Sequence, residues 1–246
     1  FLVLGFCIGC CAGFGVPVAK YFGAGDHRTM QNYIFNGAVL TAIIAAILMI
    51  ACSLSCGRIL HLLSVPDDIF GNAYAYLIVI FIGIPFTLLY NYLSSILRSV
   101  GDSRTPFMFL GFSAVLNIFL DILFIVPFHM GIAGAAWATI LSQFLSALFS
   151  LLVGLKNFPV LHLRREDFHD ISGTISLHLK TGFPMGFQMS VMCIGQLAMQ
   201  TVVNSLGTAA VAGYTAASKA DQLSVLVNNA MMTAISNYVA QNFGAG

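Results

Sequence analysis

The chain has 246 residues, of which 59% are hydrophobic and only 8% are charged. Its mean hydropathy is +0.91 and its formal net charge is +1. A soluble domain carries about 25% charged residues, and nucleic-acid-binding domains carry a clear basic excess. The composition therefore excludes an ordinary soluble enzyme, a disordered chain and a nucleic-acid partner. It predicts an all-α protein that crosses a lipid bilayer several times.

Seven stretches are long and apolar enough to cross a membrane, which takes about 20 residues. The first stretch is apolar from Phe1 and has no basic leader, so we expect a helix entered partway in a fragment of a longer protein. Pro85 predicts a kink in the third stretch. Thr105, as cap, and Pro106, in the first turn, predict the start of the fourth. The stretches are 1–21, 33–54, 69–97, 106–127, 131–155, 182–206 and 223–243.

The basic residues between these stretches and at their ends divide unevenly, with eight on one side of the membrane and two on the other. The positive-inside rule assigns the richer side to the cytoplasm. The connector 156–181 falls on that side. Its His162, His169 and His178 are expected on a solvated or surface-lying linker, with a pH sensor as the alternative. The eight are Lys20, Arg28, Arg98, Arg104, Lys156, Arg164, Arg165 and Lys180; the two are Arg58 and Lys219.

The six cysteines show no spacing typical of a metal site or of a disulfide framework. We expect them to be small apolar helix residues, and we expect no bound metal. They are Cys7, Cys10, Cys11, Cys52, Cys56 and Cys193.

An internal repeat relates residues 18–25 to residues 239–246, with six of eight positions identical. Both copies end an apolar stretch on the cytoplasmic side, and they are six spans apart. An even number of spans returns the chain to the same side, so the repeat is parallel, about an axis along the membrane normal. Two six-helix lobes follow. Residues 1–155 would run from the end of helix 2 to helix 6, 156–181 would be the linker, and 182–246 would be helices 7 and 8.

Asp121 is the only acidic residue in a predicted span between positions 106 and 206. A charge at mid-membrane costs at least about 2.5–3.5 kcal/mol and marks ion or proton paths. The alternative is a neutral Asp121 that hydrogen-bonds a neighbouring helix. Asn117 lies one turn earlier, on the same helix face. At 1.5 Å per residue, Asp121, Thr139 and Tyr76 lie about 9, 12 and 10 Å below the outer surface, so one polar layer can hold all three.

Span 182–206 carries Gln196, Gln200 and Asn204 at four-residue spacing, with Met192 on the same helix. This pattern is typical of a helix face that lines a cavity for varied substrates. Ordinary helix packing explains the same pattern.

Several motifs occur together in a specific order. They are the repeated Phe-Gly-Ala-Gly helix ends, LRSVGDSRTP at 97–106, NIFLD at 117–121, GIAGAAWAT at 131–139 and GFPMG at 182–186. In these motifs the chain resembles the multidrug and toxic compound extrusion (MATE) family of cation-coupled efflux transporters. The resemblance implies twelve helices in two lobes with a drug cavity between them. It also implies exchange of H⁺ or Na⁺ for organic, cationic drugs across the cell membrane, without a cofactor, by a protein that is monomeric when full length.

One MATE branch implies a first-lobe cation site at Asn117, Asp121, Thr139 and Tyr76, completed by an acid on helix 1 that this sequence does not contain. Another branch places an acid on helix 7. Span 182–206 has none, which favours coupling in the first lobe.

The sequence leaves two alternatives open. A lipid-linked oligosaccharide flippase of the related superfamily should carry several Arg or Lys within its spans, where only Lys219 is ambiguously placed. An intramembrane enzyme could use Asp67 and Asp68, but no second acidic motif accompanies them.

Overall fold

The structure is a computed structural model that describes residues 2–62, 65, 67–157 and 171–246. All regular elements in this described part are α-helices, as expected. They are α1 (Leu2–Gly23), α2 (His27–Leu62), α3 (Asp67–Ile82), α4 (Ile84–Ser99), α5 (Arg104–Ile125), α6 (Gly131–Asn157), α7 (Ile171–Ser205) and α8 (Thr208–Ala245).

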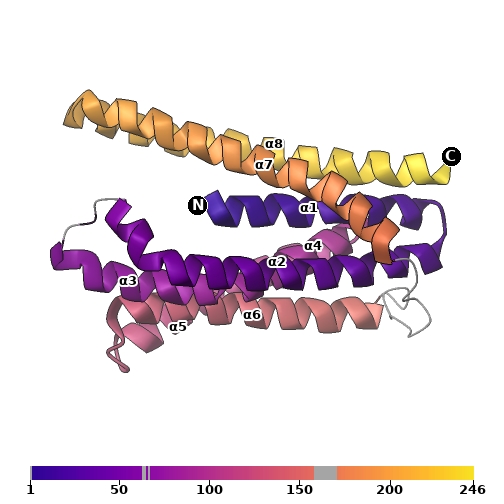
Figure 1. The fold of residues 1–246 in the computed structure, drawn as a ribbon, viewed down its shortest axis with the longest axis horizontal. Helices are drawn as coiled ribbons and strands as arrows, with labels where there is room; N and C mark the ends of the chain where they lie inside the picture. Colours follow the sequence, from indigo (N-terminus) through magenta and orange to yellow (C-terminus); the bar gives the residue numbers. More distant parts are fainter. Residues whose placement is uncertain (1, 63–64, 66, 158–170) are drawn as a thin grey trace.

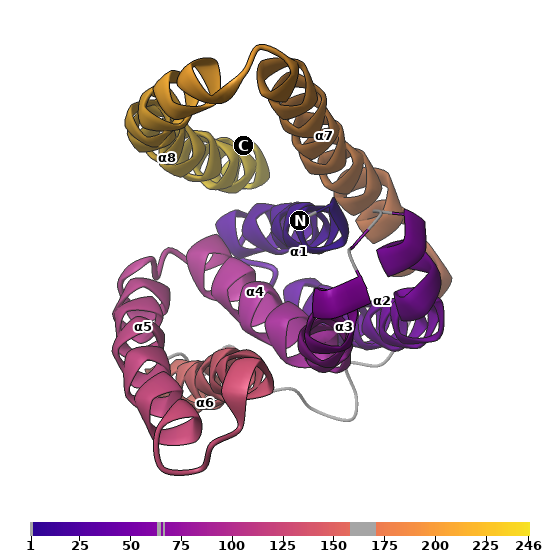
Figure 2. The same cartoon turned by 90° about the vertical axis from the view of Figure 1, so that its left-hand side faces the viewer.

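Helix α1 lies at the centre of the assembly and packs against α2, α4, α7 and α8. Helix α8 and most of α7 lie on one side of α1, while α2 to α6 lie on the other, and one end of α7 reaches α2 (Figure 2). In Figure 1, α7 and α8 come closest to the remaining helices at the right-hand end and diverge from them toward the left. The right-hand end is the one that the Lys and Arg distribution assigns to the cytoplasm.

Four helices of the described chain are long and apolar enough to cross a membrane, namely α1, α2, α5 and α6. The pair α3–α4 makes a fifth if the two helices form one bent span. Helices α7 and α8, the sixth and seventh predicted spans, are not in this set. Helix α8 carries Lys219, Asp221, Asn228 and Asn229 within its length, so its polar residues lower the hydropathy of any long window.

The break between α3 and α4 confirms the kink predicted from Pro85. The two helices meet at 44°. Gly83 still donates its N–H to the carbonyl of Val79 at 2.9 Å, while Pro85 lies in the first turn of α4. Proline has no N–H to donate, so the ladder of α3 cannot continue through this position. Gly83 also lets Ile140 of α6 pack directly on the break, since a methyl group at Gly83 would collide with that side chain.

Helix α5 starts differently from the sequence-based expectation. Asp102 provides the cap, because its Oδ1 accepts the backbone N–H groups of Arg104 and Thr105, both at 3.0 Å. Thr105 therefore lies inside the first turn and does not cap it. A carboxylate at a helix N-terminus also faces the positive end of the helix dipole.

Helix α7 begins at Ile171 rather than at residue 182, so the last part of the predicted linker is helical. His178 is fully buried there, with 0% exposure, between the rings of Phe14 and Tyr33. The expectation of a solvated linker is therefore wrong for His178, because α7 continues past the apolar stretch and packs against α1 and α2. His162 and His169 lie outside the described residues.

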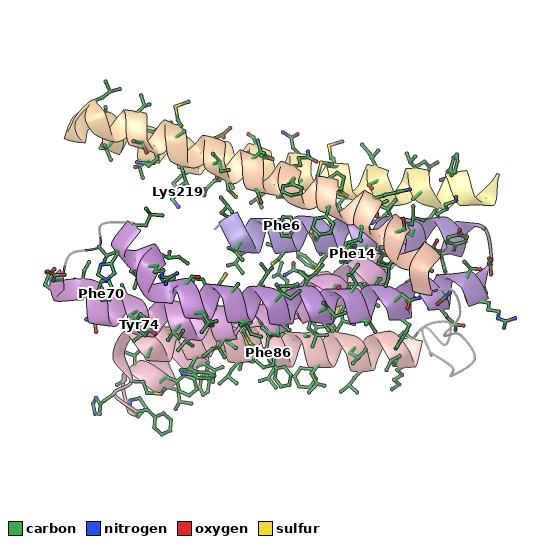
Figure 3. All side chains as sticks on the ribbon, in the orientation of Figure 1. Phe6, Phe14, Phe70, Tyr74, Phe86 and Lys219 are labelled. Carbon is green, nitrogen blue, oxygen red and sulfur yellow. The ribbon has the colours of Figure 1, made fainter. Side chains whose placement is uncertain are left out.

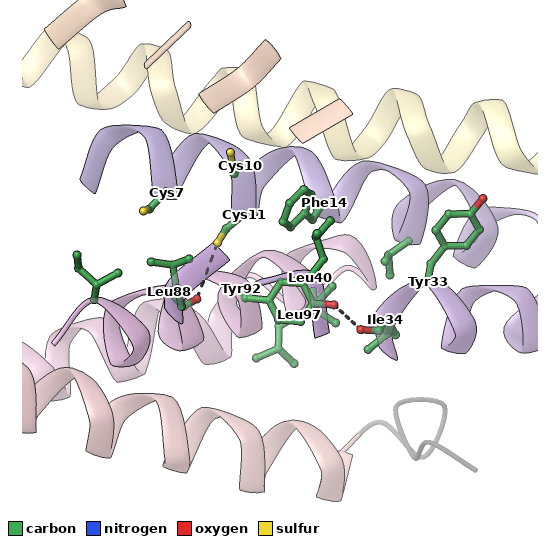
Figure 4. Packing of buried hydrophobic residues seen from close by; sticks show 14 of the residues in the cluster. Cys7, Cys10, Cys11, Phe14, Tyr33, Ile34, Leu40, Leu88, Tyr92 and Leu97 are labelled. Carbon is green, nitrogen blue, oxygen red and sulfur yellow. Dashed lines mark hydrogen bonds between the residues drawn. The ribbon is translucent and has the colours of Figure 1, made fainter. Parts of the chain in front are cut away.

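The main core lies among α1, α2 and α4 (Figure 4). Tyr92 donates its hydroxyl to the carbonyl of Ile34 at 2.5 Å. Five of the six cysteines are buried, and Cys7, Cys10, Cys11 and Cys52 belong to this core. They pack as the small apolar residues that the sequence predicted.

Candidate functional site

The structure brings Asn117 and Thr139 together across the antiparallel helices α5 and α6. Asn117 Nδ2 donates a hydrogen bond of 3.4 Å to Thr139 Oγ1. The Thr139 hydroxyl donates in turn to the carbonyl of Ala135 at 3.0 Å, one turn earlier in α6. The close approach follows from small side chains: at Gly134, an added methyl group would lie 3.1 Å from Phe124 Cβ. The close packing of α5 against α6 thus holds the Asn117 amide and the Thr139 hydroxyl next to each other.

Asp121 lies on α5 between Asn117, which contacts Thr139, and Phe124, which packs against Gly134. It is one helical turn from Asn117. Its side chain is half-buried, and its Oδ1 is fully buried without a hydrogen-bond partner among the described residues. Burying a carboxylate oxygen without a partner is unfavourable, and a buried acid is normally paired, protonated or bound to a cation. The geometry therefore leaves one strong oxygen acceptor available for a proton or a cation.

Tyr76 is the fourth predicted member of this group. It lies on α3, which packs against α6, and its side chain is 37% exposed. Within the described chain its hydroxyl makes no hydrogen bond to Asn117, Asp121 or Thr139. The structure therefore brings Asn117 and Thr139 into direct contact, with Asp121 beside them, but does not join Tyr76 to them.

A polar contact that was not predicted from the sequence lies farther along α6. The Thr87 hydroxyl of α4 donates to Gln143 Oε1 at 2.5 Å, and Asn91 Nδ2 donates to the Thr87 carbonyl at 2.8 Å. Gln143 follows Thr139 by four residues, so both lie on one side of α6. This four-residue spacing of polar residues is the sequence feature from which the contact could have been predicted. Polar groups thus join α6 to α5 at Thr139 and to α4 at Gln143.

The predicted substrate face of α7 lies in the half of the helix that diverges from the other helices. Met192 and Gln196 are exposed, and Gln200 is half-buried and interacts with its surroundings. The Asn204 side chain lies outside the described residues. Toward the other end of α7, Phe183 and Phe187 contact Phe6 of α1, one of the residues labelled in Figure 3, with ring centroids 5.7 and 5.5 Å apart.

The two copies of the sequence repeat meet in the structure. A methyl group on Gly23 of α1 would collide with the backbone of Gln241 in α8, and one on Gly244 would collide with the backbone of Lys20. The repeat relates Gly23 to Gly244 and Lys20 to Gln241. The two contacts are therefore the same contact seen from each copy, which is the property of an interface on a two-fold axis.

Comparisons with known proteins agree with this architecture. The MatE family model matches residues 1–123 and 184–246. The Bacillus subtilis (strain 168) protein named "Probable multidrug resistance protein YpnP" is 37% identical over 99% of this chain and 54% of its own length. A Shewanella oneidensis protein named "FAD transporter" is 24% identical over 97% of this chain and 54% of its own length.

The fold is also that of solved MATE structures. The structure of MATE in complex with MaL6 matches with a TM-score of 0.92 and 22% identity, over 99% of this chain and 55% of the other. The chain thus spans about half the length of the curated relatives it matches. The matched family model shows that this chain belongs to the MATE family of multi-pass cell-membrane transporters.

Proposed function

We propose that the full-length protein is an antiporter that exports organic, cationic drugs across the cell membrane by alternating access, driven by H⁺ or Na⁺. The observation that carries the proposal is the buried, unpartnered Oδ1 of Asp121 beside the Asn117–Thr139 hydrogen bond. The name of the Bacillus relative, a probable multidrug resistance protein, supports drugs as the substrates. The Shewanella name shows that other organic substrates occur among the relatives.

The chemistry of the site suits a proton or a hard cation. A proton on Asp121 would neutralise a charge that is costly inside the membrane. Sodium would instead be bound by hard oxygen ligands, which the Asp121 carboxylate, the Asn117 amide and the Thr139 hydroxyl offer. Asn117 uses its Nδ2 to reach Thr139, which leaves its amide oxygen without a hydrogen bond among the described residues.

Coupling requires that the cation and the drug favour different arrangements of the two lobes. A ligand shifts a conformational equilibrium only by its difference in affinity for the two states. A cation at Asp121 would favour one arrangement of α5 and α6, and a drug beside α7 would favour the other. The proposed drug-binding residues are on α7, namely Met192, Gln196, Gln200 and Asn204.

The test replaces Asp121 by Asn in the full-length protein, reconstituted into liposomes. Asp121→Asn keeps the size of the side chain but removes the ionisable group. We expect cation-driven export of a cationic dye to fall to the protein-free background, while the gel-filtration profile and Tm stay near those of the wild type. Separate proton and sodium gradients identify the driving ion.

Asp68→Asn is the matched control, because Asp68 is an exposed acid in the first turn of α3. We expect its export rate to equal that of the wild type. Undiminished export by Asp121→Asn would contradict the coupling role of Asp121. Wild-type protein that moves a lipid-linked oligosaccharide, but no dye under any cation gradient, would favour the flippase alternative.

A further inference from the structure

The contact between the ends of α1 and α8 has a property that ordinary helix packing lacks. Gly23 lies against the backbone of Gln241, and Gly244 lies against the backbone of Lys20. Exchanging the two sequence copies turns the first contact into the second. The two contacts are therefore equivalent halves of one crossing, and a separation of the ends of α1 and α8 breaks both together.

The positions at which the two copies differ hold the crossing from opposite sides. Gln241 of the second copy donates its Nε2 to the carbonyl of Ser99 at 2.8 Å, at the end of α4. Lys20 of the first copy places its ammonium 5.3 Å from the ring centroid of Phe243 in the second copy. Both contacts join α8 to first-lobe helices.

Ser99 is itself fixed to the first lobe. Its hydroxyl lies 2.8 Å from the carbonyl of Gly15 and 2.9 Å from that of Ser95, so it bonds α1 and its own helix α4. The end of α4 therefore remains with α1, and the Gln241–Ser99 hydrogen bond is the one that must break if α8 moves away.

The crossing lies at the end of the molecule that the Lys and Arg distribution assigns to the cytoplasm, beside Lys20 and Arg28. Ala24 and Asn242 are exposed, and Phe243 is 73% exposed. When the crossing separates, Gln241, the Ser99 carbonyl and Lys20 can exchange their contacts for water. In the membrane interior the same separation would leave polar groups unpaired. These helix ends can therefore part without leaving polar groups unpaired.

We propose that the Gly23–Gly244 crossing is a releasable closure between the lobes at the end rich in Lys and Arg, held by the Gln241–Ser99 hydrogen bond. This proposal rests on the proposed alternating access and names the contact that must open to give the inward-facing state. The structure has this end closed, while α7 and α8 diverge from the other helices at the opposite end (Figure 1). Both glycines are required, because a side chain at either position meets backbone that cannot move aside.

The test measures the distance between nitroxide labels at Arg28→Cys and Asn242→Cys in the full-length protein, in lipid nanodiscs without drug. Both positions are exposed. Cys193, the cysteine that is not fully buried, is replaced by Ser to keep labelling specific. We expect a short distance in the wild type and a shift of most of the population to a longer one in Gly244→Leu. Gly23→Leu should give the same shift, and the double variant should add little.

Gly213→Leu is the matched control, because it lies on the same helix and a Cβ added there would meet no other part of the described chain within 4 Å. It should leave the distance distribution unchanged. Wild-type distances in folded Gly244→Leu, or a shift in only one of the two glycine variants, would overturn the proposal. This readout needs no transport, so its failure is separate from a failure of cation coupling.

A second measurement covers the case in which the leucine variants do not fold. The Arg28→Cys and Asn242→Cys protein is cross-linked with a reducible bis-thiol reagent, with glycine at positions 23 and 244. Dye export should stop on cross-linking and return on reduction, while either single-cysteine protein is unaffected. Export that continues in fully cross-linked protein would show that the crossing does not open.

Discussion

Asn117 donates its side-chain amide to the hydroxyl of Thr139 across 3.4 Å, and this bond joins α5 to α6 one helical turn from Asp121. The same hydroxyl is anchored by its bond to the carbonyl of Ala135. Thr139 thus fixes the direction of the Asn117 amide, and with it the polar surroundings of the buried Asp121 Oδ1.

Replacing Thr139 by Val keeps its shape but removes the acceptor for Asn117. A buried donor left without a partner costs about 1–3 kcal/mol. If this cost falls on the cation-bound state, about 1.4 kcal/mol corresponds to a tenfold weaker affinity. We therefore expect the cation concentration that half-activates export to rise about tenfold. Thr139→Ser keeps the hydroxyl, so its half-activating cation concentration should stay close to that of the wild type. An unchanged concentration in Thr139→Val would show that the Asn117–Thr139 hydrogen bond does not contribute to cation binding.

Gly83 and Ile140 should behave as a coupled pair at the break between α3 and α4. The methyl group of Gly83→Ala collides with the Ile140 side chain, and overpacking of this kind costs about 1–3 kcal/mol. Ile140→Ala alone leaves a cavity and costs about 2–5 kcal/mol. The double variant should lose less stability than the sum of the two, because the new methyl group occupies part of the cavity.

Thermal unfolding in detergent measures this coupling. Gly111→Ala on α5 is the control, since a Cβ added at Gly111 would meet no other described part of the protein within 4 Å. Alanine in a helix interior is favoured over glycine by about 0.5–1 kcal/mol, so this variant should be as stable as the wild type or more so. Strictly additive losses for Gly83 and Ile140 would show that the two do not touch.

Asp26 caps α2 and should give the protein a small acid-dependent stability. The hydrogen bonds from the Thr29 side chain and from its backbone N–H, the latter 3.1 Å from Oδ1, hold the pKa of Asp26 below its usual value. Asp26→Ala should lower the free energy of unfolding by about 0.5–2 kcal/mol, toward the low end because the cap is exposed. Differential scanning fluorimetry from pH 3 to 8 is the measurement.

The sign of the pH effect follows from the lowered pKa. The ionised cap stabilises the fold above the unfolded-state pKa of about 3.9, and this stabilisation is lost as the pH falls through the lower folded-state value. The difference between wild type and Asp26→Ala should thus be full at pH 7 and shrink in acid. Asp26→Asn retains a capping side chain that does not titrate, so its stability relative to Asp26→Ala should not vary with pH. Equal Tm values for wild type and Asp26→Ala at pH 7 would refute the cap.

The sequence predicted local features well where one residue type permits few conformations. Pro85 predicted the bend of the third span because its ring removes an N–H that the helix ladder needs. The cysteines were correctly assigned to the apolar core. The start of α5 was wrong by a small margin, because Asp102, Ser103 and Thr105 are all capping residue types and only the backbone path selects Asp102.

The sequence alone determined that this chain is a multi-helix membrane protein with an internal repeat, because 8% charged residues and a parallel eight-residue duplication leave few other folds. It also isolated Asp121, since a lone acid in an apolar span is chemically conspicuous. Tertiary structure decided which polar residues meet. It joined Asn117 to Thr139 but not Tyr76, and it buried His178 between two rings. It also brought the helix ends at Gly23 and Gly244 together, although most of the sequence lies between these two glycines. Depth along a helix can be counted from the sequence, but the direction in which a side chain points depends on helix rotation, and packing against neighbouring helices sets that rotation.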